Sequence, residues 1–313
     1  MHAVRRCSLL PGSHPLSTPP TPGPNTREDY HLDLGSEFFY QMEGDMELPT
    51  IQQGQRKVVH IKQGQVFLLP SRIPHSPQRK VGTFGLVIER KREQDELDGL
   101  RWYTDFEAPQ QVLWDKFFYC GDLERDLVPV VKQYKGSAEA KDRVVRDNVT
   151  PAAELPWQID SDTAVPEPFD LLPWIEQHRS ELVEGPEQAS LPLFGDAHPD
   201  REFSVRVVGG GADGAPVSAE SSPSVAEVWL YQLEGEAVVT VGSSGRLPLP
   251  EESYPFCCLY TSCSPTRPSP TDSKMTGIAV RSQSRSRCEL DAAASSHGAP
   301  YTPWLAARAR LEW

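Results

Sequence analysis

The sequence predicts a mainly β protein that contains two related antiparallel domains. Short apolar runs, separated by glycine, proline or charged turns, recur over 37–42, 56–61, 65–70 and 83–90. Regular short runs of this kind are typical of β-sandwiches and β-barrels. The string FYQMEGDMEL at 39–48 also returns as LYQLEGEAVV at 230–239. Such a repeat indicates two copies of one domain.

Composition divides the chain into five segments. Residues 1–24 are rich in proline and serine and aperiodic, so we expect them to be disordered. Residues 25–112 hold the first set of strands, and residues 113–168 form a helix followed by a charged, proline-rich linker. Residues 169–252 hold the second set of strands. Residues 253–313 lose all periodicity, and we expect a disordered tail.

Two stretches have apolar residues at helical spacing. Leu123, Leu127 and Val130 recur at intervals of three and four residues, with acidic residues early and a lysine late. This pattern predicts a helix over 117–133. A second, shorter helix is predicted over 171–182.

Acidic residues outnumber basic ones by 44 to 31, which gives a formal net charge of −13. Nucleic acids and anionic membranes attract basic surfaces, so we expect neither as a partner. No apolar run of 18 residues could span a membrane. The six cysteines include no Cys-x-x-Cys pair, which favours free thiols in a reducing compartment, and we expect a cytosolic protein. A transit peptide within the basic first 26 residues is the alternative.

Two histidines and a glutamate form a candidate metal site. His31, Asp33, Gly35 and Glu37 have the same parity, so their side chains are expected on one face of an extended chain. His75 follows an apolar strand in LLPSRIPHSP, and an antiparallel neighbour could bring it opposite. Two imidazoles and one carboxylate, with open positions on the metal, are the ligand set of non-haem Fe(II) oxygenases. The same set accepts Zn, Co or Ni, which leaves the metal itself open.

The second copy of the repeat lacks these ligands. Alignment of Tyr231 with Tyr40 places Val228 opposite Glu37. Glu227 is one residue out of register, and a shift of one residue moves a side chain to the other face of a strand. We therefore expect the second domain to be structural and to hold no metal.

Four strings, PNTREDYH, FYQMEGDM, FLLPSRIPHSPQR and GLVIER, resemble the animal-type 3-hydroxyanthranilate 3,4-dioxygenase family. The close resemblance covers residues 23–135, and a weaker one covers 169–250. Residues 23–44 and 64–79 are similar to the two cupin motifs, except that Asp33 stands where a second histidine is common. The resemblance implies a double cupin, that is, two antiparallel β-barrels or jelly rolls with short connecting helices, the first of which is catalytic.

The resemblance implies one Fe(II) per chain, bound by His31, Glu37 and His75. Arg27 would lie beside the O₂ position and act in catalysis by stabilising developing negative charge. Bacterial members carry a second iron on C-terminal Cys-x-x-Cys pairs. This chain has no such pair, so we expect a single metal.

The implied substrate is the small aromatic acid 3-hydroxyanthranilate. Ring opening with O₂ would give 2-amino-3-carboxymuconate semialdehyde, which closes to quinolinate on the kynurenine pathway to NAD. Arg79 would pair with the substrate carboxylate through its planar guanidinium. Glu89 would bind the substrate hydroxyl or amine and act as a catalytic acceptor, and Glu37 would also bind the substrate. The animal-type members resemble pseudo-dimers within one chain, so we expect a monomer.

The chain departs from the family pattern at both ends. Family members have apolar strands before the PNTR string, whereas residues 1–22 are rich in proline and serine. The last strands of the second barrel are replaced by the tail after Ser253. We therefore expect a double cupin without its first and last strands. Two alternatives remain open, namely a non-catalytic or unstable isoform of the enzyme and a metal-dependent cupin sugar isomerase.

Overall fold

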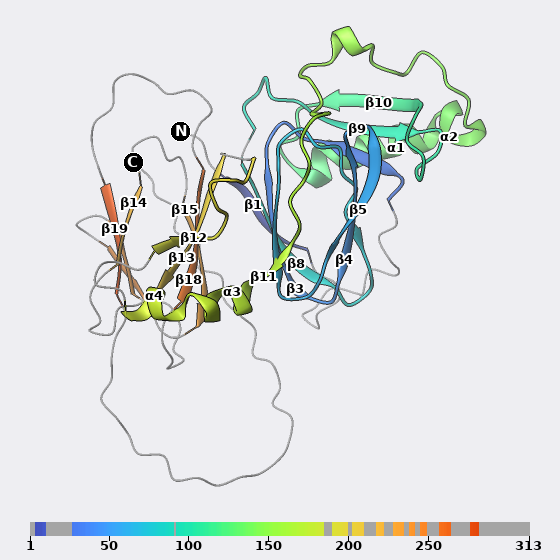
Figure 1. Cartoon of the computed structure of the whole chain (residues 1–313). Coiled ribbons are helices and arrows are strands. Elements are labelled where there is room, and N and C mark those ends of the chain that lie inside the picture. The colour runs from blue at the N-terminus through green and yellow to red at the C-terminus, as the bar shows by residue number, and fades with distance from the viewer. Residues whose placement is uncertain are drawn as a thin grey trace. The chain divides into compact units, whose positions relative to one another are not determined.

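The computed structural model describes residues 4–10, 27–90, 92–184, 190–199, 202–209, 217–221, 228–234, 238–241, 245–248, 257–263 and 276–281. The chain forms two compact units, Met1–Trp174 with Asp196–Phe203 and Ile175–Gly195 with Ser204–Trp313. Antiparallel strands dominate each unit, as Figure 1 shows. The predicted mainly β fold class is confirmed.

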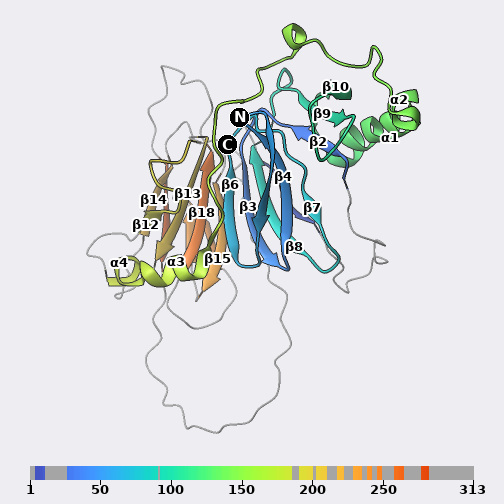
Figure 2. The ribbon, with the colours of Figure 1, turned by 45° about the vertical axis from the view of Figure 1, so that its right-hand side comes forward.

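The first unit contains three antiparallel sheets among its described residues. Its strands are Val4–Leu10 (β1), Asp29–Leu32 (β2), Glu37–Glu43 (β3), Met46–Gln52 (β4), Gln55–Ile61 (β5), Gln65–Leu69 (β6), Gln78–Arg79 (β7), Phe84–Arg90 (β8), Asp98–Tyr103 (β9), Val112–Phe118 (β10) and Phe169–Asp170 (β11). The sheet orders are β1-β8-β3-β6-β11, β10-β9-β2 and β5-β4-β7. Figure 2 shows β3, β6 and β8 beside β4 and β7.

Apolar side chains of β3, β4, β5, β6 and β8 fill the interior between the five-stranded sheet and the β5-β4-β7 sheet. The rings of Phe39 and Phe67 lie 5.9 Å apart between centroids. The whole buried cluster comprises Phe39, Met46, Leu48, Val59, Ile61, Phe67, Leu69, Ile73, Val87 and Val165. Full burial of one such side chain contributes about 1.5–3 kcal/mol, so this cluster holds the two sheets together.

The four strands predicted in this region are present as β3, β5, β6 and β8. No strand was predicted at β4, which contains Pro49. Six of the seven residues of β4 are buried, so no alternation of apolar and polar residues marks this strand. Its backbone pairs with β5 on one side and with β7 on the other.

A helical segment covers β9 and β10. The helices among the described residues are the π-turn Leu123–Leu127 (η1), Val128–Gly136 (α1), Ala138–Asp142 (α2), the 3₁₀ turn Ala152–Glu154 (η2), Leu171–Gln177 (α3) and Arg179–Glu184 (α4). Trp102 of β9 stacks on Tyr134 of α1 with ring centroids 4.0 Å apart. A helix is therefore present in the region predicted over 117–133. The predicted start was too early, because Phe117 and Phe118 are the last residues of β10. None of the described helices is long and apolar enough to span a membrane.

The proline-rich stretch after these helices packs against the first barrel. Nε1 of Trp157 donates to the carbonyl oxygen of Leu97 at 2.8 Å. Val165 lies in the barrel core, and its backbone N–H donates to Oε1 of Gln52 at 3.2 Å. The stretch predicted as a linker is thus part of the first unit. An extended chain without secondary structure can pack in this way when the barrel satisfies its backbone hydrogen bonds.

The second unit contains two four-stranded sheets among its described residues. Its strands are Ser190–Pro192 (β12), Phe203–Gly209 (β13), Val217–Ser221 (β14), Val228–Glu234 (β15), Val238–Val241 (β16), Gly245–Pro248 (β17), Cys257–Cys263 (β18) and Thr276–Arg281 (β19). The sheet orders are β12-β13-β18-β15 and β14-β19-β16-β17. β15 is seven residues long, like β3, and the repeat aligns their first residues. That the second unit is a degenerate copy of the first stays a prediction.

At both ends the structure differs from the sequence prediction. β1 pairs with β8 at one edge of the five-stranded sheet, and β18 and β19 pair with other strands of the second unit. These strands lie in segments that were expected to be disordered, and the absence of the family's first and last strands stays a prediction. Each of the three runs is free of proline, and a sheet edge offers hydrogen bonds to any extended chain. The other residues of 1–24 and much of 253–313 lie outside the described residues.

Candidate metal centre

His31 and His75 lie side by side on adjacent backbone segments. The N–H of His31 donates to the carbonyl oxygen of His75 at 2.7 Å, and the reverse hydrogen bond is 3.1 Å long. Their ring centroids are 5.2 Å apart. The turn before His75 passes through Arg72, whose φ of 64° is in the left-handed region. This conformation favours glycine, so the surrounding fold has to hold Arg72 in it.

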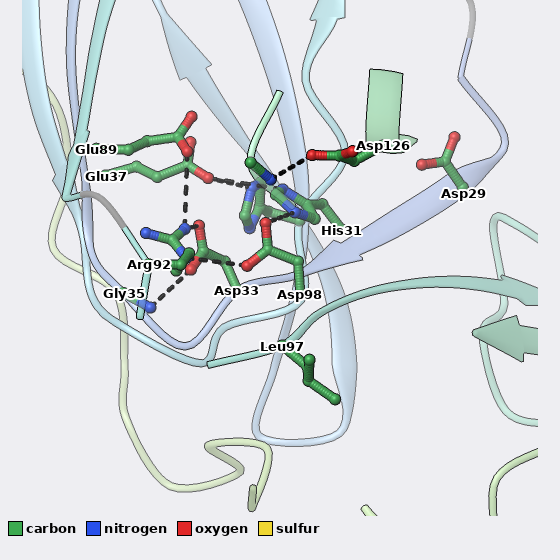
Figure 3. A network of polar contacts seen from close by, with 12 residues as sticks. Asp29, His31, Asp33, Gly35, Glu37, Glu89, Arg92, Leu97, Asp98 and Asp126 are labelled. Atoms are coloured by element: carbon green, nitrogen blue, oxygen red, sulfur yellow. Dashed lines mark hydrogen bonds and ion pairs between the residues drawn. The ribbon is translucent and has the colours of Figure 1, made fainter. Parts of the chain in front are cut away.

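Glu37 is the first residue of β3 and completes the group. Its Oε1 atom lies 2.9 Å from Nε2 of His75 and 3.8 Å from Nδ1 of His31. All three side chains are buried, and Figure 3 shows the Glu37 carboxylate directed toward His31. His31 and Glu37 belong to different sheets. The predicted group is therefore assembled, but not from one face of one strand, because residues 33–36 are not extended.

The donor atoms of this group fit a metal. Among the described residues, Oε1 of Glu37 and Nε2 of His75 are buried and make no hydrogen bond of good geometry. Nδ1 of His75 meets the carbonyl oxygen of Ile73 at 2.9 Å. A proton on that nitrogen leaves the lone pair of Nε2 directed at Glu37. Buried polar atoms without partners are costly, and one cation between the three side chains would satisfy them.

The charges at the site keep Glu37 ionised. Burial alone raises the pKa of its carboxyl group, but the positive charges of His75, His31 and Arg92 outweigh burial and lower the pKa to about 2. Burial also lowers the pKa of His75, and attraction to Glu37 raises it overall. An ionised carboxylate is the form that binds a metal.

A buried arginine lies behind His31. Nε of Arg92 donates to Oδ1 of Asp98 at 2.9 Å, and Nη2 of Arg92 donates to Asp33. Oδ2 of Asp98 lies 3.4 Å from Nε2 of His31, and Asp33 accepts from the N–H of Gly35 at 2.6 Å. Figure 3 shows this chain of contacts. Arg92 and Asp98 could not be selected from the sequence, because a charged residue beside a strand is usually solvated.

Arg27 enters from the segment before β2. Its guanidinium pairs with the Asp29 carboxylate through Nε at 3.2 Å and through Nη2. The Gln78 side chain holds its backbone, with both hydrogen bonds 3.0 Å long. Burial lowers the pKa of Arg27, but Asp29 and the more weakly acting Glu37 raise it overall. Sequence reasoning selected Arg27 and missed the two partners that fix it.

Arg79 and Glu89 come from β7 and β8. Glu89 is the register partner of Glu37 between β3 and β8, and its side chain is 27% exposed. Burial and the charge of Glu37 raise the pKa of Glu89 to about 7. Burial and the charge of Arg27 lower the pKa of Arg79 to about 10, although Glu37 and Glu89 oppose this shift. Nε of Arg79 is buried without a hydrogen-bond partner among the described residues.

Comparison with sequence relatives identifies the family of this chain. The family model described as 3-hydroxyanthranilic acid dioxygenase matches residues 20–135. The 3-hydroxyanthranilate 3,4-dioxygenase of Xenopus laevis is 40% identical over 254 residues, which cover 79% of this chain and 84% of that protein. The chain belongs to the 3-hydroxyanthranilate 3,4-dioxygenase family. The members from Homo sapiens and Bos taurus are 41% and 43% identical, over 74% and 70% of this chain and 75% and 71% of theirs.

Solved structures add little to this family assignment. An oxalate decarboxylase mutant from Bacillus subtilis has a TM-score of 0.38 and 13% identity, over 82% of this chain and 67% of that chain. A likeness of this size carries no conclusion about activity or fold. The membership in the 3-hydroxyanthranilate 3,4-dioxygenase family therefore rests on the sequence relatives, and the resemblance seen in the sequence is confirmed by them.

Addition of a divalent metal is expected to raise the thermal stability of the metal-free chain. A ligand that binds only the folded state at 100 times its Kd stabilises that state by about 2.7 kcal/mol. The three donors of this site come from separate segments and converge only in the folded chain. Thermal unfolding with and without excess Co(II) measures the effect. An unchanged midpoint under saturating Co(II) would contradict a metal site here.

Proposed function

We propose that this chain is a non-haem Fe(II) dioxygenase that opens the ring of 3-hydroxyanthranilate with O₂. The proposed product is 2-amino-3-carboxymuconate semialdehyde, which closes to quinolinate on the kynurenine pathway to NAD. The observation that carries the proposal is the convergence of His31, Glu37 and His75 as buried donors in a chain of this family. Two imidazoles and one carboxylate leave open positions for substrate and O₂.

His31, Glu37 and His75 would hold one Fe(II). A bound Fe(II) supplies the redox chemistry that lets O₂ react with an electron-rich aromatic ring. The protein keeps Glu37 ionised, with a pKa of about 2. It also buries the three side chains, and exclusion of water strengthens every electrostatic interaction at the site.

Arg79 and Glu89 would bind the substrate. A planar guanidinium can donate two parallel hydrogen bonds to a carboxylate, and Nε of Arg79 is a buried donor without a partner among the described residues. The pKa of Glu89 is about 7. A carboxyl group with such a pKa exchanges a proton readily near neutral pH, so Glu89 would accept a proton from the substrate hydroxyl or amine.

Arg27 would lie on the O₂ side of the site. Asp29 fixes its guanidinium and Gln78 fixes its backbone. A positive charge that is already in place stabilises negative charge developing on oxygen without reorganisation. The three residues thus support a catalytic role for Arg27 as a preorganised cation.

The alternative of a cupin sugar isomerase finds no support in the site. Asp33 stands where a second histidine is common in cupins, but its carboxylate is bound by Arg92 and by the N–H of Gly35. A carboxylate held by two donors is a poor substitute for a free ligand. The alternative of a non-catalytic isoform is an outcome of the experiment below.

We also propose that the protein acts as a cytosolic monomer that binds neither nucleic acid nor membranes. The net charge of −13 supports the absence of polyanionic partners. No Cys-x-x-Cys pair occurs in the sequence, which suits a reducing compartment.

Anaerobic loading with Fe(II), followed by 3-hydroxyanthranilate and O₂, tests the proposed reaction. We expect iron-dependent formation of the semialdehyde. Its absorbance and its conversion to quinolinate are the two measurements that detect it. A His75→Ala chain is the control and is expected to fold but to form no product. No product from a folded, iron-loaded chain would overturn the dioxygenase proposal and favour the non-catalytic isoform.

A further inference from the structure

Arg92 is a buried cation held among acidic side chains. Its side chain is 2% exposed and lies against Asp33, at 2.9 Å from Asp98 and at 3.6 Å from Glu89. Three carboxylates around one guanidinium are more than charge neutrality requires. A buried ion pair gives little net stability, because desolvation offsets the attraction between the charges. The cluster therefore calls for an explanation other than stability.

Asp98 connects this cluster to the metal group. Its Oδ1 accepts from Nε of Arg92, and its Oδ2 lies 3.4 Å from Nε2 of His31. The other ring nitrogen of His31, Nδ1, lies 3.8 Å from Oε1 of Glu37. One edge of the imidazole thus faces the carboxylate of Asp98, and the other edge faces the proposed metal. Ligating histidines commonly give their second N–H to a carboxylate, which fixes the tautomer and the ring orientation.

We propose that Arg92 and Asp98 form a positioning pair for His31. Arg92 fixes the rotation of the Asp98 carboxylate, and Asp98 takes the Nε2 hydrogen of His31, so that the Nδ1 lone pair is directed toward Glu37. Both act on the metal through His31, and neither is assigned a contact with substrate. The inference rests on the proposed metal site and requires no turnover.

Arg92 also holds the loop that joins the two ligands on β2 and β3. Asp33 and Gly35 lie between His31 and Glu37, and Asp33 bonds to both Arg92 and the N–H of Gly35. A Cβ atom on Gly35 would lie 3.0 Å from Nη1 of Arg92. The loop therefore packs directly on the guanidinium. Arg92 thus fixes the ring of His31 through Asp98, and it fixes the loop that leads to Glu37 through Asp33.

Metal affinity of an Asp98→Asn chain tests the pair. Asparagine keeps the shape of the side chain but removes its charge. We expect the Kd for Co(II), measured by competition with a chelator, to rise about 10- to 100-fold. The visible absorption bands of bound Co(II) are expected to shift as the ring orientation of His31 changes. An Asp98→Asn chain that binds Co(II) as tightly as the unchanged protein would overturn the proposal.

Asp115→Asn provides a matched control. Asp115 is a buried acid that accepts from Nη2 of Arg101 at 2.6 Å, within the same unit. Among the described contacts, neither residue touches the metal group. We expect this variant to unfold at a lower temperature than the unchanged chain, with no change in the Kd for Co(II). A similar loss of affinity in both variants would show a general effect of stability and would overturn the positioning role.

Arg92→Lys keeps the charge but loses the planar fork of the guanidinium. It is expected to weaken Co(II) binding, and the double variant with Asp98→Asn is expected to lose less than the sum of the two changes. Fully additive losses would overturn the pair. An unchanged Kd in Arg92→Lys would also overturn it, even if Asp98→Asn fails to fold. The positioning pair and the dioxygenase proposal can fail separately. If these variants bind Co(II) more weakly but the unchanged protein forms no product, the positioning pair stands and the dioxygenase proposal falls.

Discussion

Replacement of Glu37 by glutamine is expected to abolish product formation while the chain still folds. The substitution keeps the shape of the side chain and removes the only carboxylate of the proposed ligand set. Mutation of a residue that hydrogen-bonds to a metal ligand lowers metal affinity about 10- to 100-fold. Loss of a ligand itself should therefore lower metal affinity by more than about 100-fold. The metal-free chain is expected to fold but to be less stable than the unchanged chain, because the ionised Glu37 carboxylate, whose pKa is about 2, lies 2.9 Å from Nε2 of His75 and is attracted to it.

Three measurements on the Glu37→Gln chain separate folding from metal binding. These are the unfolding midpoint without metal, the shift of that midpoint with Co(II), and product formation with Fe(II). Glu139→Gln is the matched control, since Glu139 of α2 is also a buried glutamate. Its carboxylate accepts a hydrogen bond from Asn148, which lies in the segment after α2. The control is expected to retain the Co(II) shift and the activity. A Glu37→Gln chain that keeps both would show that Glu37 is not a ligand.

Strands of the first barrel were predictable from sequence only where an apolar run stands between clear turns. β3, β5, β6 and β8 carry apolar runs between clear turns, and all four were expected. β4 and β9 are buried along nearly their whole length, but Pro49 in β4 and Asp98 and Gly99 in β9 interrupt the apolar run by which a buried strand is recognised. At both ends, proline-rich surroundings concealed short proline-free runs that pair with existing strands.

The three proposed ligands could be predicted, but the geometry that brings them together could not. The sequence placed His31 and Glu37 on one face of a single strand. In the structure they stand in different sheets, and the chain bends between them. Arg92 and Asp98 carried no signal at all, because only the fold reveals that both are buried. Residue types that bind metals are recognisable in a sequence, whereas the charges that orient them depend on burial.

Replacement of Arg79 by methionine is expected to lower kcat/KM for 3-hydroxyanthranilate by on the order of 100-fold or more. Each hydrogen bond to a charged group contributes about 1.5–3 kcal/mol, a guanidinium can make two of them to one carboxylate, and about 1.4 kcal/mol corresponds to a factor of ten. The metal-free chain is expected to be no less stable than the unchanged chain. Burial of the cation already lowers the pKa of Arg79 to about 10, which means that the fold disfavours its charge.

Comparison with 2-aminophenol, which lacks the carboxylate, isolates the role of Arg79. The proposed pairing predicts that Arg79→Met reduces kcat/KM for 3-hydroxyanthranilate and leaves kcat/KM for 2-aminophenol nearly unchanged. Arg79→Lys keeps the charge without the planar fork and should recover part of the loss. An equal reduction with both substrates would mean that Arg79 acts on the metal group or on O₂. The substrate carboxylate would then need another partner than Arg79.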